Sequence, residues 1–339
     1  MGQYWELVDL DGRQTLGTGG GKLGEWFWDN GEDIMDSLRL PVPNPKVDEL
    51  LLGTVADQLS SRLLGLAQEL YDLILDDLED MSYMALLSCA VTCKAALARS
   101  RRHIDTHQRR YVPRGLAGHR LICVGEYANL LSQLPSGMLT DEEAEEVRDF
   151  GEHNEESDGS PSLWAYASEH FGRRSNYDLR NPNTSFQERV QECAWAMPQR
   201  WRLGDWILVM GVVCYPKRWP WALCNLVKRE YVREQAAMQL CETLPSKPWR
   251  PWDSKRPGFW HFLLANICCS YSSSYAMTYQ GKDLANGRWA GDRFAITPLD
   301  HLPLTAPGEG EWKDVTDEVA ALVKRIWAAE CGDLGSETE

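Results

Sequence analysis

Two short stretches of the chain share one pattern of hydrophobic and polar positions. Trp5 to Leu16 aligns without gaps on Trp221 to Val232. Each stretch reads Trp-x-Leu-[Val/Cys]-[Asp/Asn]-Leu, then a polar turn that contains an Arg, then a short return. Alternation followed by turn residues such as Asp11-Gly12 is typical of a strand, a tight turn and a second strand. The repeat therefore predicts two β-hairpins.

A second motif places a Gly and a polar residue before a β-rich run. It occurs three times, starting at Gly118, Gly204 and Gly291. We interpret the three runs as core strands that are entered through a Gly turn. Apolar spacing of three to four residues predicts helices between these β segments. Their ranges are 60–78, 82–99, 186–196, 228–242 and 314–330.

The predicted fold class is α+β: antiparallel β-hairpins and strands with packed helices and an inserted helical hairpin. The hairpin covers residues 63–100 and has two apolar stripes on either side of a break at Asp80-Met81-Ser82. The first stripe comprises Leu66, Leu70, Leu73, Ile74 and Leu78, and the second comprises Leu86, Leu87, Ala90, Val91 and Cys93. Two short helices cannot bury both stripes by themselves, so they need the rest of the chain or another protein.

Residues 63–100 resemble the F-box, whose usual pattern is Leu-Pro-x-Glu-Leu/Ile, a run of Ile and Leu, a short acidic break, and a closing Val-Cys-Lys/Arg. The segment 66–70 (Leu-Ala-Gln-Glu-Leu) resembles the opening, 74–78 the middle and 89–94 the close. Ala67 stands where the pattern has Pro, and Leu97 stands near the usual aromatic residue.

The resemblance implies that the hairpin docks on the small acidic adaptor subunit of cullin-type ubiquitin ligases. The implied partner-binding residues are Leu66, Glu69, Leu70, Ile74, Leu78, Leu86, Leu87 and Cys93. Burial of six aliphatic side chains at roughly 1.5–3 kcal/mol each would outweigh an association cost of about 4–15 kcal/mol. The expected function is thus a substrate receptor of a ubiquitin ligase. The alternative is an enzyme or ligand-binding α+β domain in which the hairpin is only core.

The opening segment 1–11, with its Met-Gly-Gln-Tyr-Trp start, and the Trp-Ala-Gly-Asp-Arg motif at 289–293 resemble a family of uncharacterised fungal proteins. Members of that family often carry a degenerate F-box at the same place, and no chemistry is known for them. The expected organisation is an N-terminal β-hairpin module at 1–50, an F-box-like segment at 63–105, a Trp-rich α+β domain at 111–330 and a disordered tail at 331–339. The two ends of the chain are expected to fold together around the inserted hairpin.

The net charge of −15 argues against binding to nucleic acid, because affinity for phosphates depends on basic side chains. The ten cysteines are scattered through apolar runs without a secretory signal, which predicts reduced thiols in a cytoplasmic or nuclear protein. No apolar run approaches the roughly 18 residues of a membrane span. The basic segment from Lys94 to Arg120 is read as a solvated helix face or as a docking surface for an acidic partner.

Fifteen tryptophans are many for this length. An exposed aromatic platform is one way to hold a client protein. The candidate client surface comprises Trp219, Trp221, Trp249 and Trp252. Packing around the β repeats is the alternative role for these side chains.

No motif predicts a metal, a cofactor or a catalytic residue. Cys89, Cys93, His103 and His107 have the residue types of a zinc site, but their spacing is too short for a Cys2His2 finger. The glycines at 17–21 precede Lys22 but lack the following Ser or Thr of a phosphate loop, so we expect a flexible hairpin connection. If the chain is an enzyme, Asp292 and Arg293 are its best candidates, and Asp205 is a distant second.

Overall fold

The computed structural model divides the chain into two compact units. The β-sheet unit comprises residues 1–39, 116–179 and 220–339, and the helical unit comprises residues 40–115 and 180–219. The residues that the structure describes are 2–28, 31–40, 42–43, 45–54, 61–111, 115–128, 131–153, 160–179, 219–244, 247–250, 253–303 and 310–331. The predicted helix at 186–196, the predicted strand after Gly204 and the tail from 332 onward lie outside them.

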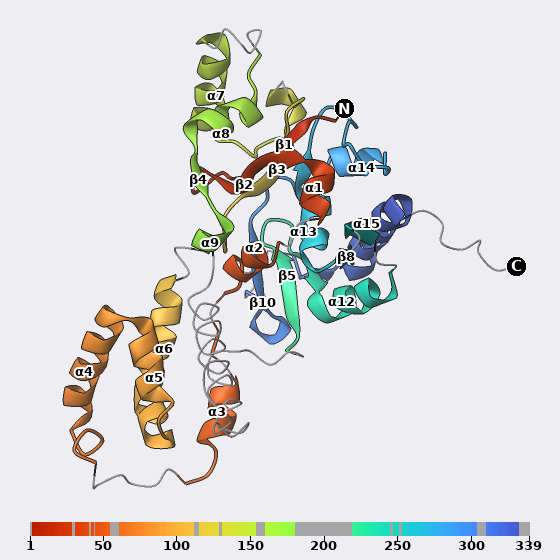
Figure 1. The fold of residues 1–339 in the computed structure, drawn as a ribbon. Helices are drawn as coiled ribbons and strands as arrows, with labels where there is room; N and C mark the ends of the chain where they lie inside the picture. Colours follow the sequence, from red (N-terminus) through yellow and green to blue (C-terminus); the bar gives the residue numbers. More distant parts are fainter. Residues whose placement is uncertain are drawn as a thin grey trace, which may run out of the picture. The chain divides into compact units, whose positions relative to one another are not determined.

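The first sheet has the strand order β4-β2-β1-β3-β9 (Figure 1). Its strands are β1 (Tyr4–Asp9), β2 (Gln14–Lys22), β3 (Leu121–Gly125), β4 (Gly172–Arg174) and β9 (Cys268–Cys269). β1 pairs antiparallel with β2 and with β3, which confirms the first predicted hairpin and the strand after Gly118. The glycines at 17–21 belong to β2, so the expectation that they form a flexible connection is wrong. The backbone N–H of Gly20 donates to the Glu6 carboxylate there.

The second sheet has the order β10-β5-β6-β11. Its strands are β5 (Trp221–Asn225), β6 (Glu230–Arg233), β10 (Phe294–Pro298) and β11 (Lys313–Asp314). β5 and β6 form the second predicted hairpin, and β10 is the strand predicted after Gly291. β7 (Lys247–Arg250) and β8 (Asp253–Lys255) make a separate two-stranded sheet.

Helices complete the β-sheet unit. They are α1 (Leu23–Trp28), α2 (Glu32–Ser37), α7 (Asp141–His153), α8 (Leu163–His170), α9 (Asn176–Leu179), α12 (Glu234–Thr243), α13 (Trp260–Ile267), α14 (Lys282–Ala285) and α15 (Thr316–Cys331). The helix predicted from Lys228 begins only at Glu234, because residues 230–233 extend the hairpin as β6. The predicted buried stripe of α15, from Val319 to Trp327, is buried as expected.

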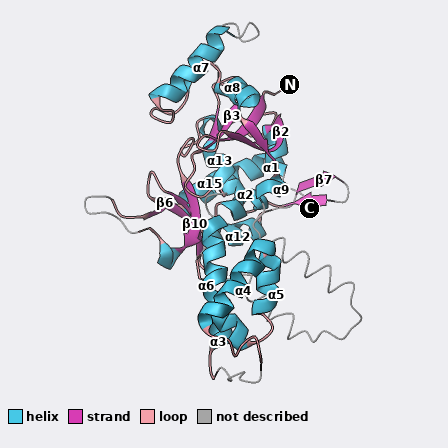
Figure 2. Cartoon of the chain, turned by 90° about the vertical axis from the view of Figure 1, so that its left-hand side faces the viewer, coloured by secondary structure: helices cyan, strands magenta, loops and turns pink. Residues whose placement is uncertain are grey.

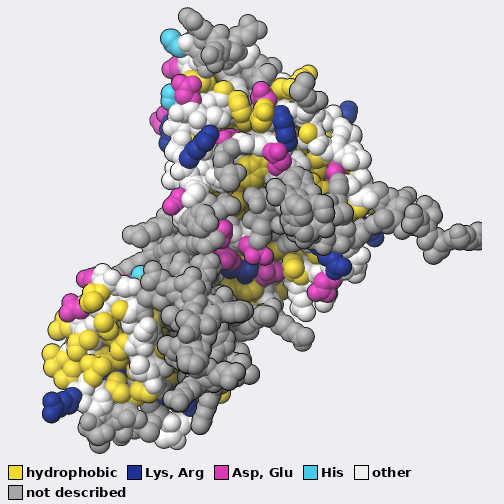
Figure 3. All heavy atoms as spheres, in the orientation of Figure 1, with side chains coloured by type: hydrophobic (Ala, Val, Ile, Leu, Met, Phe, Trp, Pro, Cys, Tyr) yellow, Lys and Arg dark blue, Asp and Glu magenta, His cyan; other side chains and the backbone are white. Residues whose placement is uncertain are grey.

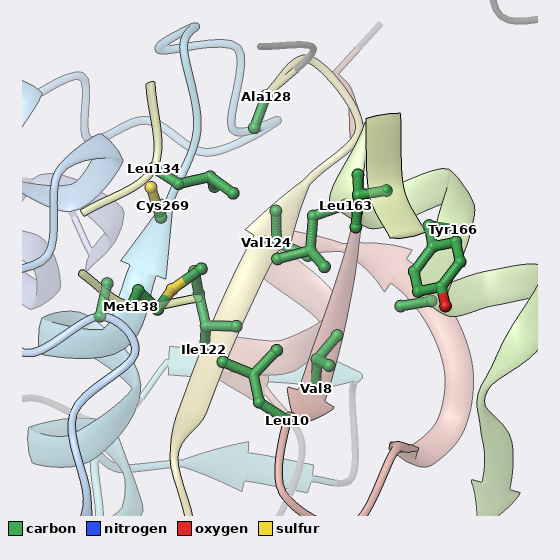
Figure 4. Packing of buried hydrophobic residues seen from close by; sticks show 13 residues of the cluster. Val8, Leu10, Ile122, Val124, Ala128, Leu134, Met138, Leu163, Tyr166 and Cys269 are labelled. Carbon is green, nitrogen blue, oxygen red and sulfur yellow. The ribbon is translucent and has the colours of Figure 1, made fainter. Parts of the chain in front are cut away.

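One core of the β-sheet unit lies between the first sheet and the helices α7 and α8 (Figure 4). Val8 of β1 and Val124 of β3 point toward Leu163 and Tyr166 of α8. Alternate residues of a strand face the same side of a sheet, so these positions supply one continuous apolar face. That face explains why the N-terminal hairpin and β3 belong to one unit despite their separation in sequence.

The described part of the helical unit consists of α3 (Pro45–Leu51), α4 (Gln68–Met81), α5 (Tyr83–Ala90) and α6 (Lys94–Tyr111), and the last three lie side by side in both ribbon views (Figures 1 and 2). The predicted helix at 82–99 is two helices, α5 and α6, separated by residues 91–93. The structure thus has the predicted α+β fold class, with sheets and helices in one chain. Among the described helices, none combines the length and the apolar character that a bilayer span requires.

Candidate protein-binding surface

Helix α4 begins after Ala67, a residue that follows a turn and has non-helical backbone angles. Ala67 has ψ 152° and its side chain makes no capping hydrogen bond, and it occupies the place where the F-box pattern has Pro. The start is held instead by Arg99 of α6, whose guanidinium donates to the carbonyls of Leu64 and Leu66 at 2.8 and 2.9 Å. The same guanidinium stacks over the Tyr71 ring at 4.2 Å. Arg99 therefore fixes the entry of the chain into α4.

One face of α4 is the core of the helical unit. Tyr71 and Leu75 are fully buried. They belong to a cluster formed with side chains of α3, α5 and α6. The buried members of the cluster are Val47, Tyr71, Leu75, Tyr83, Leu86, Leu87, Ala90, Leu97 and Ile104. The described helices thus share a core whose buried members all lie between Val47 and Ile104 in sequence.

The other face of α4 is apolar and exposed. Leu70 is 51%, Leu73 61% and Met81 78% exposed, and Leu63 in the preceding turn is 38% exposed. These positions recur with helical spacing, so they form one stripe, in which Ile74 and Leu66 are half-buried. Hydrophobic side chains gather over the α4 side of the helical unit in Figure 3. We call the six residues Leu63, Leu66, Leu70, Leu73, Ile74 and Met81 the α4 face.

Acidic side chains border the α4 face. α4 carries six Asp and Glu residues and no Lys or Arg. Glu69, Asp77 and Asp80 are exposed. Any surface that covers the α4 face must therefore accommodate negative charge at its margins.

Two histidines of α6 contact acidic side chains of α4. The ring nitrogens of His103 lie 3.0 Å from Asp72 Oδ1 and 3.2 Å from Asp76 Oδ1. His107 Nδ1 lies 3.1 Å from Glu79 Oε1, and its ring stacks on Tyr83. The contact with His103 lowers the pKa of Asp72. These contacts fix the rotation of α4, so the α4 face points outward from the helical unit's own core.

The structure changes the predicted set of partner-binding residues. Leu66, Leu70 and Ile74 lie on the α4 face, and Glu69 is exposed beside it. Leu86 and Leu87 are fully buried in the helical core, which corrects their expected role as contacts.

Two other expected contacts are half-buried. Leu78 packs partly against the helical core, and Cys93 is half-buried with its sulfur accepting from the Ala96 N–H. Leu73 belongs to the predicted stripe but was not among the predicted contacts. Leu63 and Met81 lie just beyond the two ends of the predicted stripe, where only the three-to-four spacing could have indicated them.

The basic helix face expected to meet an acidic partner is largely used within the helical unit. Arg99 supports α4 as described, and Arg101 forms ion pairs with Asp48 and Asp105. The side chains of Arg109 and Arg110, and all of Arg114, lie outside the described residues. In the described part of α6, the basic residues thus stabilise the unit more than they offer a docking surface.

The candidate client surface of four tryptophans is not assembled in the described structure. Trp221 is buried beneath the Arg39 guanidinium, 4.8 Å from its ring, which corrects its expected exposure. Trp219 is half-buried. The side chain of Trp249 and all of Trp252 lie outside the described residues.

The candidates for catalysis have structural partners. Asp292 accepts from Asn225 Nδ2 at 2.7 Å and forms an ion pair with Lys228. Arg293 pairs with Asp11 at 2.8 Å and also donates to the Gly118 carbonyl. Both side chains thus make structural contacts in the connections between strands of the β-sheet unit. Asp205 lies outside the described residues.

The proposed zinc ligands do not converge. Cys89 lies 3.8 Å from the Tyr71 hydroxyl, whereas His103 and His107 face the acids of α4. Within the described ranges, Asp76, Glu79 and His103 are the group whose ligand atoms lie within 4.8 Å of one another. The contacts of His103 with Asp76 and of His107 with Glu79 between α4 and α6 account for this arrangement.

Comparisons with protein-family models, with curated protein sequences and with solved structures find no match for this chain. The geometry of the α4 face is therefore the basis for a functional assignment.

Proposed function

We propose that this protein is an interaction adaptor that uses the α4 face to dock on the adaptor subunit of a cullin-type ubiquitin ligase. The observation that carries the proposal is the two-sided character of α4. Its buried side completes the helical core, while Leu70, Leu73 and Met81 remain more than half exposed on the other side. Contiguous exposed apolar patches mark interaction sites on soluble proteins. The resemblance of residues 63–100 to the F-box supplies the identity of the proposed partner.

The energy of covering the α4 face limits the affinity. A fully exposed Leu or Met contributes roughly 1.5–3 kcal/mol when it is buried. Scaled by their exposure, Leu63, Leu70, Leu73 and Met81 together would contribute about 3–7 kcal/mol. Association costs about 4–15 kcal/mol, so apolar burial alone does not give a stable complex. The expectation that six leucine and isoleucine side chains suffice is wrong, because two of them are already buried.

Polar contacts must therefore add to the affinity. Glu69, Asp77 and Asp80 border the α4 face, and each would gain a partner if the bound surface offers Lys or Arg at its margin. An adaptor that is acidic overall would still have to present basic side chains at this one place. The proposal thus includes a salt-sensitive rim around an apolar centre.

The direct test is equilibrium binding of the purified ligase adaptor subunit to the full-length chain and to two variants. In the variant Leu70→Asp with Leu73→Asp, two charges replace the centre of the α4 face. The matched control is Val227→Asp, which changes a side chain that is 57% exposed in the β-sheet unit. Calorimetry measures the affinity, and circular dichroism checks that all three proteins melt alike.

We expect the double variant to bind at least about tenfold more weakly, because charges replace central apolar contacts. The control should bind like the wild type. Equal affinity of the double variant, or no binding of the adaptor to the wild type, would refute the proposed function.

We also propose a reducing compartment, the cytoplasm or the nucleus. The cysteines in the described ranges are free, and Cys123, Cys268 and Cys269 are buried. Burial raises the pKa of Cys269 to about 11, so this thiol stays protonated and unreactive at neutral pH. Buried protonated thiols suit a protein that carries no disulfide framework.

A further inference from the structure

The two hairpins of the β-sheet unit have the same backbone geometry as well as similar sequences. Arg13 in the β1–β2 turn and Arg229 in the β5–β6 turn hold the same place in the aligned pattern. Both have left-handed φ values, 49° and 54°. Non-glycine residues rarely adopt this region, so a shared exception at an equivalent position indicates a common turn.

A third strand joins each hairpin in the same register. β3 pairs with β1 so that Leu121 lies opposite Asp9, and β10 pairs with β5 so that Phe294 lies opposite Asn225. Asp9 and Asn225 are equivalent in the aligned hairpins. Gly118 and Gly291 precede the two strands at the same distance, with φ values of 86° and 77°. The Gly-containing motif therefore has one structural role in both places.

A fourth strand extends the similarity on the far side of each hairpin. β4 runs parallel to β2, with Gly172 opposite Gln14. β11 runs parallel to β6, with Lys313 opposite Glu230. Gln14 and Glu230 are equivalent in the aligned hairpins, so the added strands have the same register.

The two halves exchange a segment. Cys268, which follows α13, pairs in parallel with Cys123 of β3. Arg39, which follows α2, pairs in parallel with Ile296 of β10. Cys123 and Ile296 are each the third residue of their strand. Each half thus contributes an extended residue, directly after a helix, to the sheet of the other half.

Reciprocal hydrogen bonds join the two sheets. The N–H of Leu121 donates to the Asp292 carbonyl, and the N–H of Phe294 donates to the His119 carbonyl. The N–H of Gly291 donates to Leu121, and the N–H of Gly118 donates to Phe294. Leu121 and Phe294 are equivalent, as are Gly118 and Gly291, so each bond from one half to the other is matched by the same bond in the reverse direction. This is the pattern of a twofold axis, here between Arg120 and Arg293.

We infer that the β-sheet unit is an internal duplication of two intertwined halves, and that residues 40–115 are an insertion into the first half. Cys268 and Gly291 of the second half correspond to Arg39 and Gly118 of the first. In the second half, loops and the short helix α14 join these two positions. In the first half the chain leaves after Arg39 and returns at Leu116, whose N–H donates to the Ser37 carbonyl at 2.9 Å. Insertions with adjacent ends leave the host fold intact.

The inference makes the inserted helices a separate cooperative unit. Among the described residues, every buried member of their core comes from within residues 40–115. The second half forms its strands although it has no helical insertion between Cys268 and Gly291, the equivalent positions. Local unfolding of the insertion should therefore leave the hydrogen bonds of both sheets protected.

Amide hydrogen exchange of the full-length chain tests this. The variant Leu75→Ala opens a cavity in the helical core, and Ile122→Ala opens one in the core of the β-sheet unit. We expect Leu75→Ala to accelerate exchange in α4–α6 by roughly thirtyfold or more while exchange in β1, β3, β5 and β10 is unchanged. Ile122→Ala should do the opposite.

If either alanine variant fails to fold, Ile104→Val and Ile122→Val provide milder cavities for the same comparison. Equal acceleration of exchange in the helices and in both sheets by a variant of one core would overturn the inference. The result does not depend on which protein binds the α4 face.

Discussion

Leu70 and Leu75 show how one helix serves two purposes at the scale of single residues. They lie five positions apart on α4, which places them about 140° apart around the helix axis. Leu75 is fully buried among its own unit's side chains, and Leu70 is half exposed. We therefore expect loss of the Leu75 side chain to destabilise the helical unit, and loss of the Leu70 side chain to weaken the proposed binding.

His119 provides a titratable contact at the same scale. Its Nδ1 atom lies 2.9 and 3.0 Å from the two carboxylate oxygens of buried Asp9. This hydrogen bond raises the pKa of His119, with Asp11 adding to the effect and Arg174 opposing it. A raised folded pKa means that folding favours the protonated imidazole. The contribution is complete below the unfolded pKa of about 6.5 and is lost as the pH rises through the folded value.

We therefore expect the wild type to exceed the variant His119→Asn in unfolding free energy by more at about pH 5.5 than at about pH 9. Urea denaturation of both proteins at the two pH values measures the difference. The variant serves as the reference for all other titrating groups, such as Glu6, whose pKa burial raises. A difference that stays constant or grows with pH would show that the Asp9 contact does not stabilise protonated His119.

Residue-level roles were the least predictable from sequence. The apolar spacing located α4 and its stripe, but Leu70 and Leu86 are equally apolar in the sequence and differ completely in exposure. Exposure depends on which helices pack against which faces, and that follows from tertiary contacts. The predicted exposure of Trp221 is wrong for the same reason, because Arg39, from a distant part of the chain, covers its ring.

At the scale of elements, the α4 face depends on a neighbouring helix. Arg99 donates to two backbone carbonyls and to Gln68 Oε1, and it stacks on Tyr71. The planar guanidinium makes these bonds simultaneously, whereas a Lys ammonium lacks that fork geometry. Arg99 is thus a positioning residue for the start of α4.

The variant Arg99→Lys keeps the charge but loses the fork. We expect it to lower the unfolding free energy of the helical unit by about 1–2 kcal/mol and to weaken adaptor binding. Denaturation followed at the helical circular dichroism signal measures the first effect, and calorimetry the second. Arg102→Lys, an exposed position on the same helix, is the matched control. Wild-type stability of Arg99→Lys would show that the start of α4 does not need this support.

Elements with strong local signals were predictable. Asp11-Gly12 and the alternating pattern gave the first hairpin, and the Gly motif gave β3 and β10. The prediction of a flexible connection at the glycines 17–21 is wrong. Their composition favours a loop, but pairing with β1 keeps this segment in the strand β2. The α5–α6 break at 91–93 also had no local signal, since residues on both sides favour helix.

At the scale of the whole molecule, the sequence repeat predicted two similar hairpins, but only the structure shows that the halves containing them exchange segments. The partners Arg39 and Ile296 share no sequence pattern, so no local rule could pair them. The helical unit takes in two stretches of the chain, residues 40–115 and 180–219, and the first of them lies between Arg39 and Leu116 of the β-sheet unit.

This organisation assigns different tasks to the two units. The duplicated sheets hold their strands by pairing and reciprocal hydrogen bonds, and the insertion offers an apolar face that its own fold leaves uncovered. The central claim is that a partner covers this face.

Oxidation of Met81 by hydrogen peroxide measures that coverage directly. Met81 belongs to the α4 face, and Met238 of α12, which is 40% exposed, is an internal control in the β-sheet unit. Mass spectrometry follows the sulfoxide at both positions with and without the purified ligase adaptor subunit. We expect the adaptor to slow the oxidation of Met81 and to leave the oxidation rate of Met238 unchanged. An unchanged rate at Met81 in a saturated complex would contradict it.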